Sequence, residues 1–248
     1  MVRLPPSSTR TRSITPLKNN GLAKVSKLDA NTKDKIVCAL PSLVLDRVLG
    51  GYLSEFHEKY PGVKLNTYHF TNTGPFLNNS PECYERIKQD KIDFVIDVDY
   101  ACFHHGLNVT SFISPQIILI ASKAFLAKNN LGTTISKEQF IKLPVVGSDD
   151  LFQHQFRSRG IPINDFVTTA DFAEVYGMVK SGAGIGLHLR EFVALEKCEC
   201  GDEVVEIKVA GINHLQKFSL VFGYKQDIRK APKAFIDGAV EYIKKLLK

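Results

Sequence analysis

Apolar and polar positions along residues 36–248 switch repeatedly between the two-residue period of strands and the 3.6-residue period of helices. The first apolar run is followed by Leu45, Val48, Leu49, Tyr52, Leu53 and Phe56 at helical spacing. Alternating strands and helices are typical of a parallel sheet with helices on both faces. In this first part the pattern predicts strands at 36–40, 63–70 and 91–98, and helices at 45–59 and 83–89.

The same alternation continues to the end of the chain. A long apolar strand interrupted by Pro115 is predicted at 111–122, and the last segment has the apolar stripe of an amphipathic helix. The remaining elements are strands at 143–147, 163–169, 203–209 and 218–224, and helices at 136–141, 151–160 and 231–247.

Three glycines, Gly182, Gly184 and Gly186, resemble a dinucleotide-binding fingerprint but stand in the wrong order of elements. That fingerprint follows a strand and opens a helix, so that backbone N–H groups hold a pyrophosphate. Here the glycines follow apolar residues at helical spacing. Gly182 is therefore predicted to end a helix, the other two to allow close packing, and residues 185–187 to form a short buried strand. This order excludes a nucleotide cradle.

Charge is concentrated at the N-terminus. Of the 32 Lys and Arg residues, eight lie in residues 1–35 beside two Asp, and the other 24 are balanced by 24 acidic residues. Residues 1–35, rich in Pro, Ser, Thr and Asn, are predicted to be a disordered or weakly helical basic tail, with ordered structure from Ile36. The neutral remainder has no overall basic surplus for nucleic acid. No apolar run spans a membrane or forms a signal peptide, so we expect a cytoplasmic protein.

Cysteine and histidine usage indicates neither a metal site nor a catalytic site. Five scattered cysteines suit free thiols in a reducing compartment. Cys198–Cys200 lacks the two-residue gap of most zinc knuckles and has no second pair. Cys102–His105 is slightly more suggestive, but it is read as a polar loop with a solvated His pair. No histidine stands beside Ser or Cys in a nucleophile motif. We expect no catalytic residue, no metal and no cofactor.

Four segments together resemble the effector-binding domain of LysR-type transcriptional regulators. Each segment alone is a weak match, so the resemblance depends on the order and spacing of all four. In the second segment, Lys91 replaces a glycine of the family pattern. The segments are IVCALPSLVLDRVLGGYLSEFHEKYPGVKL (36–65), KIDFVIDV (91–98), TTADFAEVYGMVKSGAGIGLHLREF (168–192) and FSLVFGYKQDIRKAPKAFIDGAVEYI (218–243).

The resemblance implies an α/β fold of two Rossmann-like subdomains joined by two crossover strands, as in type 2 periplasmic binding proteins. Subdomain I would comprise about 36–114 and 219–248, and subdomain II about 115–218. A small molecule, carboxylate or amino-acid-like, would bind in the cleft between them, where helix N-termini favour an anion.

The resemblance also implies which residues contact that ligand. Hydroxyls and amides orient a ligand without the cost of burying a charge. Ser42 and Thr169 also fit plain helix caps, residues 71–73 also fit a solvated turn, and Asp99 is a further candidate. The acidic pair Asp149 and Asp150 disfavours a strongly anionic ligand or favours an amine-bearing one. The expected ligand-binding residues are Ser42, Thr71, Asn72, Thr73, Ser148, Thr168 and Thr169.

The family's N-terminal winged helix-turn-helix is not present intact. Residues 10–17, RTRSITPL, resemble its wing and the opening of the linker helix, which makes 1–35 a remnant of these elements or a simple basic tail. The resemblance implies a ligand-sensing domain that forms a homodimer or higher homo-oligomer and binds DNA only if the missing domain is supplied. The alternatives are a solute-binding protein for a transporter and an enzyme on the same fold.

Overall fold

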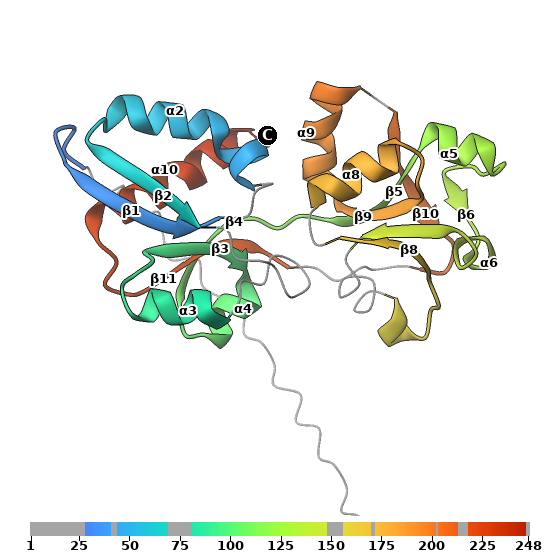
Figure 1. Cartoon of the computed structure of the whole chain (residues 1–248), viewed down its shortest axis with the longest axis horizontal. Coiled ribbons are helices and arrows are strands. Elements are labelled where there is room, and N and C mark those ends of the chain that lie inside the picture. The colour runs from blue at the N-terminus through green and yellow to red at the C-terminus, as the bar shows by residue number, and fades with distance from the viewer. Residues whose placement is uncertain are drawn as a thin grey trace, which may run out of the picture.

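Two α/β lobes, each built on one mixed sheet, make up the folded part of the chain (Figure 1). The structure is a computed structural model that describes residues 28–40, 44–68, 81–147, 156–169, 172–201, 203–212 and 218–246. Sheet I has the strand order β2-β1-β3-β11-β4, and sheet II has the order β6-β10-β5-β9-β7-β8. We call the parts built on these sheets lobe I and lobe II. The predicted two-lobed α/β fold is confirmed.

Lobe I takes its elements from both ends of the described chain. Helices α2 and α10 cover one face of sheet I, and α3 and α4 lie on the other (Figure 1). A π-helical turn, η1, precedes α2. The elements are β1 (Asp34–Ala39), η1 (Leu45–Leu49), α2 (Gly50–Lys59), β2 (Val63–Tyr68), α3 (Pro81–Lys88), β3 (Phe94–Val98), α4 (Asp99–His104), β4 (Asn108–Ile113), β11 (Leu220–Tyr224) and α10 (Lys230–Leu246).

Lobe II is continuous in the sequence from β5 to β10. Its glycine-rich segment runs through helix α8, a turn and the fully buried strand β9. The elements are β5 (Ile117–Ser122), α5 (Lys123–Lys128), β6 (Thr134–Ile135), α6 (Lys137–Phe140), β7 (Pro144–Gly147), η2 (Arg157–Arg159), β8 (Asn164–Thr168), α8 (Phe172–Lys180), β9 (Ile185–Leu189), α9 (Arg190–Cys200) and β10 (Val204–Val209).

Strand directions differ from the parallel sheet that the alternating pattern predicts. In sheet I only β2, β1 and β3 run parallel, while β11 lies antiparallel to both β3 and β4. In sheet II β7 is parallel to β8 and β9, and β5 is antiparallel to β9 and β10. The strands that run against both neighbours are β5 and β11, the first strand after each of the two crossovers between the lobes.

Four other sequence predictions are corrected by the structure. The apolar run 111–122 is two strands, β4 and β5, in different sheets, because Pro115 separates the lobes instead of interrupting one strand. The segment around Cys102 is helix α4 and not a polar loop, and Cys102 is buried. β1 begins at Asp34, two residues before the predicted start. Of the helix expected at 151–160, residues 157–159 form one 3-10 turn, and 151–155 lie outside the described residues.

The glycines of lobe II have the roles that the pattern predicted. Gly182 has φ of +86° and its N–H donates to the Val179 carbonyl at 2.9 Å, which ends α8. A Cβ on Gly184 would collide with the carbonyl oxygen of Pro144 in β7. A Cβ on Gly186 would lie 2.7 Å from a methyl carbon of Val179. Both glycines therefore allow close packing of β9 against its neighbours.

An aromatic cluster between α2, α10 and sheet I forms the centre of the lobe I core. Phe235 of α10 is fully buried, and its ring centroid lies 5.2 Å from that of Tyr52, 5.1 Å from that of Phe56 and 5.5 Å from that of Phe94. The Tyr52 hydroxyl donates to the Phe235 carbonyl at 2.8 Å. The pairs with Tyr52 and Phe56 are edge-to-face and the pair with Phe94 is stacked, and aromatic pairs at these separations add to the stabilisation from apolar burial.

No helix within the described parts of the chain is long and apolar enough to cross a lipid bilayer.

Candidate hinge and ligand cleft

The strand ends of lobe I face the second lobe. The arrowheads of β1, β2 and β3 point toward lobe II in Figure 1, and these strands end at Ala39, Tyr68 and Val98. Ligands of open α/β sheets bind beyond the carboxyl ends of the strands. In the sequence, the predicted site residues stand at the ends of β1, β2, β3, β7 and β8 or within five residues after them.

Most predicted site residues lie outside the described residues: Ser42, Thr71, Asn72, Thr73 and Ser148, as do Asp149 and Asp150. Thr168 is the last residue of β8, and only its backbone is described. The predicted ligand site therefore remains a prediction.

Thr169 connects the end of β8 to its neighbours. Its N–H donates to the Gly147 carbonyl at the end of β7 at 3.0 Å, and its hydroxyl donates to the Glu174 carboxylate on α8. Asp99, the first residue of α4, is half-buried, and its N–H donates to the carbonyl of Ser219 at 2.9 Å. Both residues lie where strands end, as their sequence positions predicted.

Two serines join the two passages of the chain between the lobes. Ser114 follows β4, Ser219 precedes β11, and their hydroxyl oxygens lie 2.8 Å apart. Because one serine belongs to each passage, this hydrogen bond holds the two connecting strands side by side. No local sequence pattern indicates this pair, since its members are 105 positions apart.

The first turn of α9 is bonded to the first connecting strand. The Gln116 N–H donates to the Glu191 carboxylate at 3.0 Å, and the Arg190 N–H donates to the Gln116 carbonyl at 2.8 Å. The Arg190 guanidinium also donates to the Gln116 side-chain oxygen, and to Glu206 on β10 at 2.6 and 3.0 Å. These bonds to Glu206 hold the pKa of Arg190 above its usual value. Gln116 is thereby fixed to lobe II.

The same helix packs against lobe I. Helix α9 faces β4, η1 and α10 across an apolar gap that is too small for a water molecule. On the α9 side the gap is lined by Glu191, Phe192 and Leu195. The lobe I side consists of Val48, Phe112, Ile113 and Ile243. Val48 lies within η1, and π turns are frequent at functional sites. α9 therefore belongs to lobe II but sets how closely lobe I approaches it.

A buried carboxyl group supports the end of β3, next to Asp99. Asp97 is fully buried, and it accepts hydrogen bonds from the Tyr84 hydroxyl at 2.6 Å and from the Val98 N–H at 2.7 Å. Burial, and then the charge of Asp97, raises the pKa of Tyr84 far above its usual value. The His105 ring stacks on Tyr84 with centroids 3.8 Å apart. His105, which was expected to be solvated, is half-buried as a result.

We expect His105 to lower the stability of the protein in mild acid. Desolvation by burial, and then His104 and Lys88, lower the pKa of His105 in the folded state. The unfolded chain, with a His pKa of about 6.5, then binds this proton more readily, so folding loses stability as the pH falls below about 6.5. Urea denaturation at pH 7.5 and pH 5.5 should show a smaller acid loss in His105→Phe than in the wild type. Carboxylates also change stability in acid, but the two proteins share all of them, so only His105 can make the two losses differ. Equal losses of stability in the two proteins would contradict this prediction.

Cys38, Cys83 and Cys102 are free and buried. Desolvation raises the pKa of the Cys83 thiol to about 12, and the thiols of Cys38 and Cys102 are shifted in the same direction. Such thiols are poor nucleophiles and poor ligands. Within the described ranges, His, Cys, Asp and Glu side chains form no group of three that could hold a metal ion.

The two-lobed arrangement agrees with what comparison to known proteins finds. The sequence matches the model of the LysR substrate binding domain over residues 32–243. This chain belongs to the LysR substrate-binding domain family. The match starts just before β1 and ends within α10, so both lobes and both connecting strands lie inside it. The family consists of ligand-binding domains of LysR-type transcriptional regulators. A comparison with curated proteins found no match.

Solved structures of low sequence identity share the fold of this LysR substrate-binding domain. The regulatory domain of CrgA, a LysR-type regulator from Neisseria meningitidis, is 17% identical with a TM-score of 0.65, over 85% of this chain and 98% of that one. The effector-binding domain of QuiR, solved in complex with shikimate, is 14% identical with a TM-score of 0.60, over 86% and 99%. The probable transcriptional regulator PA0477 from Pseudomonas aeruginosa is 12% identical with a TM-score of 0.70, over 87% and 68%.

Proposed function

We propose that this LysR substrate-binding domain is a sensor that binds a small molecule between its lobes. Binding changes the angle between lobe I and lobe II. The observation that carries the proposal is the hinge, in which a hydrogen bond between Ser114 and Ser219 joins the two connecting strands. Helix α9 of lobe II packs against lobe I beside them. A ligand that contacts both lobes favours one angle over the others, and so shifts the population of states. In a homodimer, which we also propose, this shift changes the geometry of the assembly.

The ligand class that we propose is a small carboxylate or an amino-acid-like molecule. Ser42, Thr71, Asn72, Thr73, Ser148, Thr168 and Thr169 offer hydroxyls and amides at strand ends of both lobes. Such groups bind a carboxylate through neutral hydrogen bonds, without placing a second charge in the cleft. That QuiR was solved with shikimate, a hydroxylated acid, supports this class.

Ligand-induced stabilisation tests the proposal. Thermal unfolding of the full chain should be followed with shikimate, benzoate and the common L-amino acids, each at millimolar concentration. A ligand at 100 times its Kd stabilises by about 2.7 kcal/mol, which corresponds to a rise in Tm of roughly 5–10 °C for a chain of this length. Thr169→Val should reduce the rise for the active compound.

Thr133→Val provides the matched control, because Thr133 is an exposed threonine in lobe II next to β6, away from the predicted site. Its ligand-induced rise should equal that of the wild type. Stabilisation by none of the compounds would refute the ligand class. An equal loss in both variants would refute the site.

Three further parts of the function are also proposals. We propose a cytoplasmic location, to which free buried thiols are suited. We propose binding without catalysis, which the release of any product from an active compound would overturn. We propose that sequence-specific DNA recognition requires a separate winged helix-turn-helix domain. Sedimentation with and without the active compound would measure the homodimer and its change of shape.

A further inference from the structure

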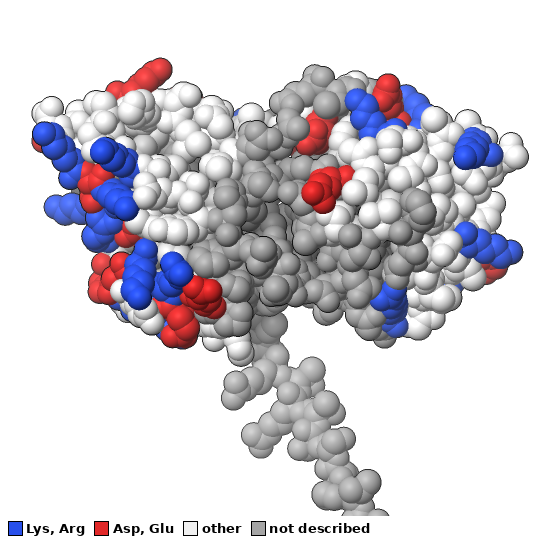
Figure 2. Space-filling model, in the orientation of Figure 1, with Lys and Arg blue, Asp and Glu red and all other residues white. Residues whose placement is uncertain are grey.

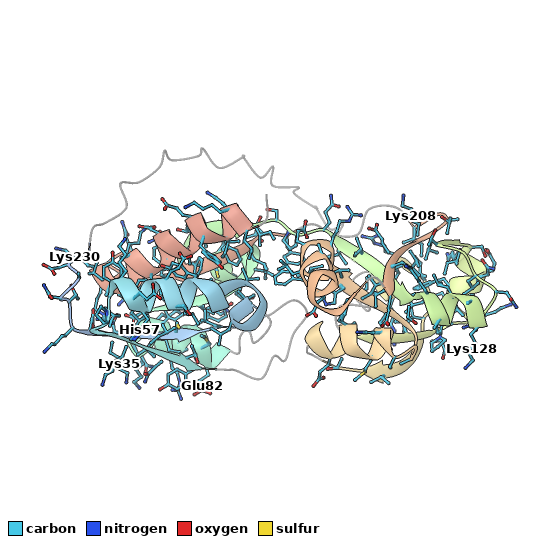
Figure 3. All side chains as sticks on the ribbon, turned by 90° about the horizontal axis from the view of Figure 1, so that it is seen from above. Lys35, His57, Glu82, Lys128, Lys208 and Lys230 are labelled. Atoms are coloured by element: carbon cyan, nitrogen blue, oxygen red, sulfur yellow. The ribbon has the colours of Figure 1, made fainter. Side chains whose placement is uncertain are left out.

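The outer end of lobe I, away from lobe II, gathers lysines from separate parts of the chain. The amino ends of the parallel strands β1, β2 and β3 lie at this end, as does the start of α10. Figure 3 labels Lys35 and Lys230 there, and blue side chains collect at this end in Figure 2, with red ones among them. We define the basic end as five exposed lysines: Lys33, Lys35, Lys64, Lys91 and Lys230.

Two of these lysines are paired directly with each other in the sheet. Lys35 of β1 stands opposite Lys64 of β2 in the parallel register, and both are exposed. Like charges in directly opposite positions destabilise a sheet. Lys64 lies on the edge strand β2, and Lys35 lies where β1 is not yet paired with β3, since that pairing starts at Cys38, so both lysines also protect open edges from unwanted pairing. An anion bound between the two lysines would relieve their repulsion.

Four carboxylates of this end are paired with two other cations, and a fifth accepts a backbone N–H. Asp34 and Asp93 bind Arg229 at 2.5 and 2.9 Å, and Asp90 binds Lys225 at 2.7 Å. Asp227 also lies within 4.0 Å of Lys225, and the Asp29 carboxylate accepts the Asn31 N–H. Among the described residues, none of the five lysines of the basic end is in an ion pair. Their charges remain available to an external anion.

We propose that the basic end of lobe I binds the phosphate backbone of DNA, independently of its sequence. Tyr68, Phe103 and Leu246, the exposed large apolar residues of the described chain, are not part of it, which disfavours a lipid bilayer. The chain enters lobe I at this end, and residues 1–27 carry six Lys or Arg and no acidic residue. Lysines spread along the ends of several strands suit the repeated phosphates of a duplex, whose counterions they release. Counted with Lys225 and Arg229, the five lysines give seven positive charges against the five carboxylates named above, a local surplus of two.

Salt-dependent binding of a labelled duplex tests the proposal. The full chain and the triple variant K33Q/K35Q/K64Q should be titrated into a fluorescein-labelled 30-base-pair duplex of random sequence at several salt concentrations. The wild type should bind at low salt, and the variant should bind at least tenfold more weakly. The slope of log K against log salt should fall by roughly 0.9 for each phosphate that the variant no longer neutralises.

The matched control, K128Q/K137Q/K208Q, removes three exposed lysines from lobe II; Figure 3 labels two of them, Lys128 and Lys208. It should retain most of the affinity. Absence of binding by the wild type, or an equal loss in both triple variants, would overturn the proposal. So would binding to phosphatidylserine vesicles without binding to the duplex, or a loss of self-association in K33Q/K35Q/K64Q alone, which would make this end a protein interface.

All these titrations are made without a small-molecule effector, and the ligand tests are made without DNA. Failure of one proposal therefore leaves the other intact.

Because Lys35 and Lys64 repel each other, K33Q/K35Q/K64Q should unfold at the same temperature as the wild type or above it. Weaker DNA binding by a variant that unfolds at that temperature cannot come from a loss of folding.

Discussion

Phe235→Ala should lower the free energy of unfolding of lobe I by about 3–5 kcal/mol, the range for truncation of a fully buried phenylalanine. The Phe235 ring has no exposed area and contacts rings from α2 and from β3. Its removal leaves a cavity among Tyr52, Phe56 and Phe94. The first two rings belong to α2 and the third to β3. Urea denaturation followed by circular dichroism would measure the change.

Phe103→Ala is the control for this substitution. Phe103 belongs to α4 and is 47% exposed, so its truncation should change stability by no more than about 0.5 kcal/mol. A similar loss of unfolding free energy in both variants would mean that Phe235 does not form the centre of the lobe I core. A loss of Phe235→Ala below about 1 kcal/mol would lead to the same conclusion.

Glycine-to-alanine substitutions at Gly186 and Gly177 should have opposite effects on stability. At Gly186 the new Cβ would lie 2.7 Å from a Val179 methyl carbon and 2.8 Å from a Val175 methyl carbon, both on buried residues of α8. Forcing α8 away from β9 should cost about 1–3 kcal/mol. Gly177 is exposed on α8 with no atom within 4 Å of its added Cβ, so alanine there should stabilise by up to about 1 kcal/mol.

A double-mutant cycle tests the cause of the Gly186 effect. If crowding against α8 is responsible, Val175→Ala should cost less in the Gly186→Ala background than in the wild type, since it removes one of the two colliding methyl groups. Additive losses would show that the two positions act independently. In that case the close approach of α8 to β9 would not be the reason for a glycine at position 186.

Sequence periodicity predicted the elements whose own residues decide their structure. α8 and β9 are examples, because the apolar spacing changes from 3.6 to 2 across Gly182, which also takes the φ that a helix-ending glycine favours. The six-residue helix α4 was missed, since it is too short for a periodic stripe and its buried side chain is a cysteine.

Features that depend on distant residues could not be read in this way. Pro115 marks a break in an apolar run, but only pairing with β11 on one side and with β9 on the other places β4 and β5 in different sheets. The Gln116–Glu191 bond spans 75 residues and has no local pattern. Ser42 and Ser148 were proposed from a family resemblance, and their positions relative to a ligand remain predictions, since they lie outside the described residues.

The place of β11 in sheet I has a consequence for synthesis on the ribosome. β11 lies between β3 and β4, although about a hundred residues are made between β4 and β11. Sheet I therefore stays divided until residues 220–224 emerge, while the strands of sheet II are all complete by residue 209. Domains generally fold as units during synthesis. Lobe II can then be a finished body while lobe I is still open, and the lobe that begins the chain is the last to close.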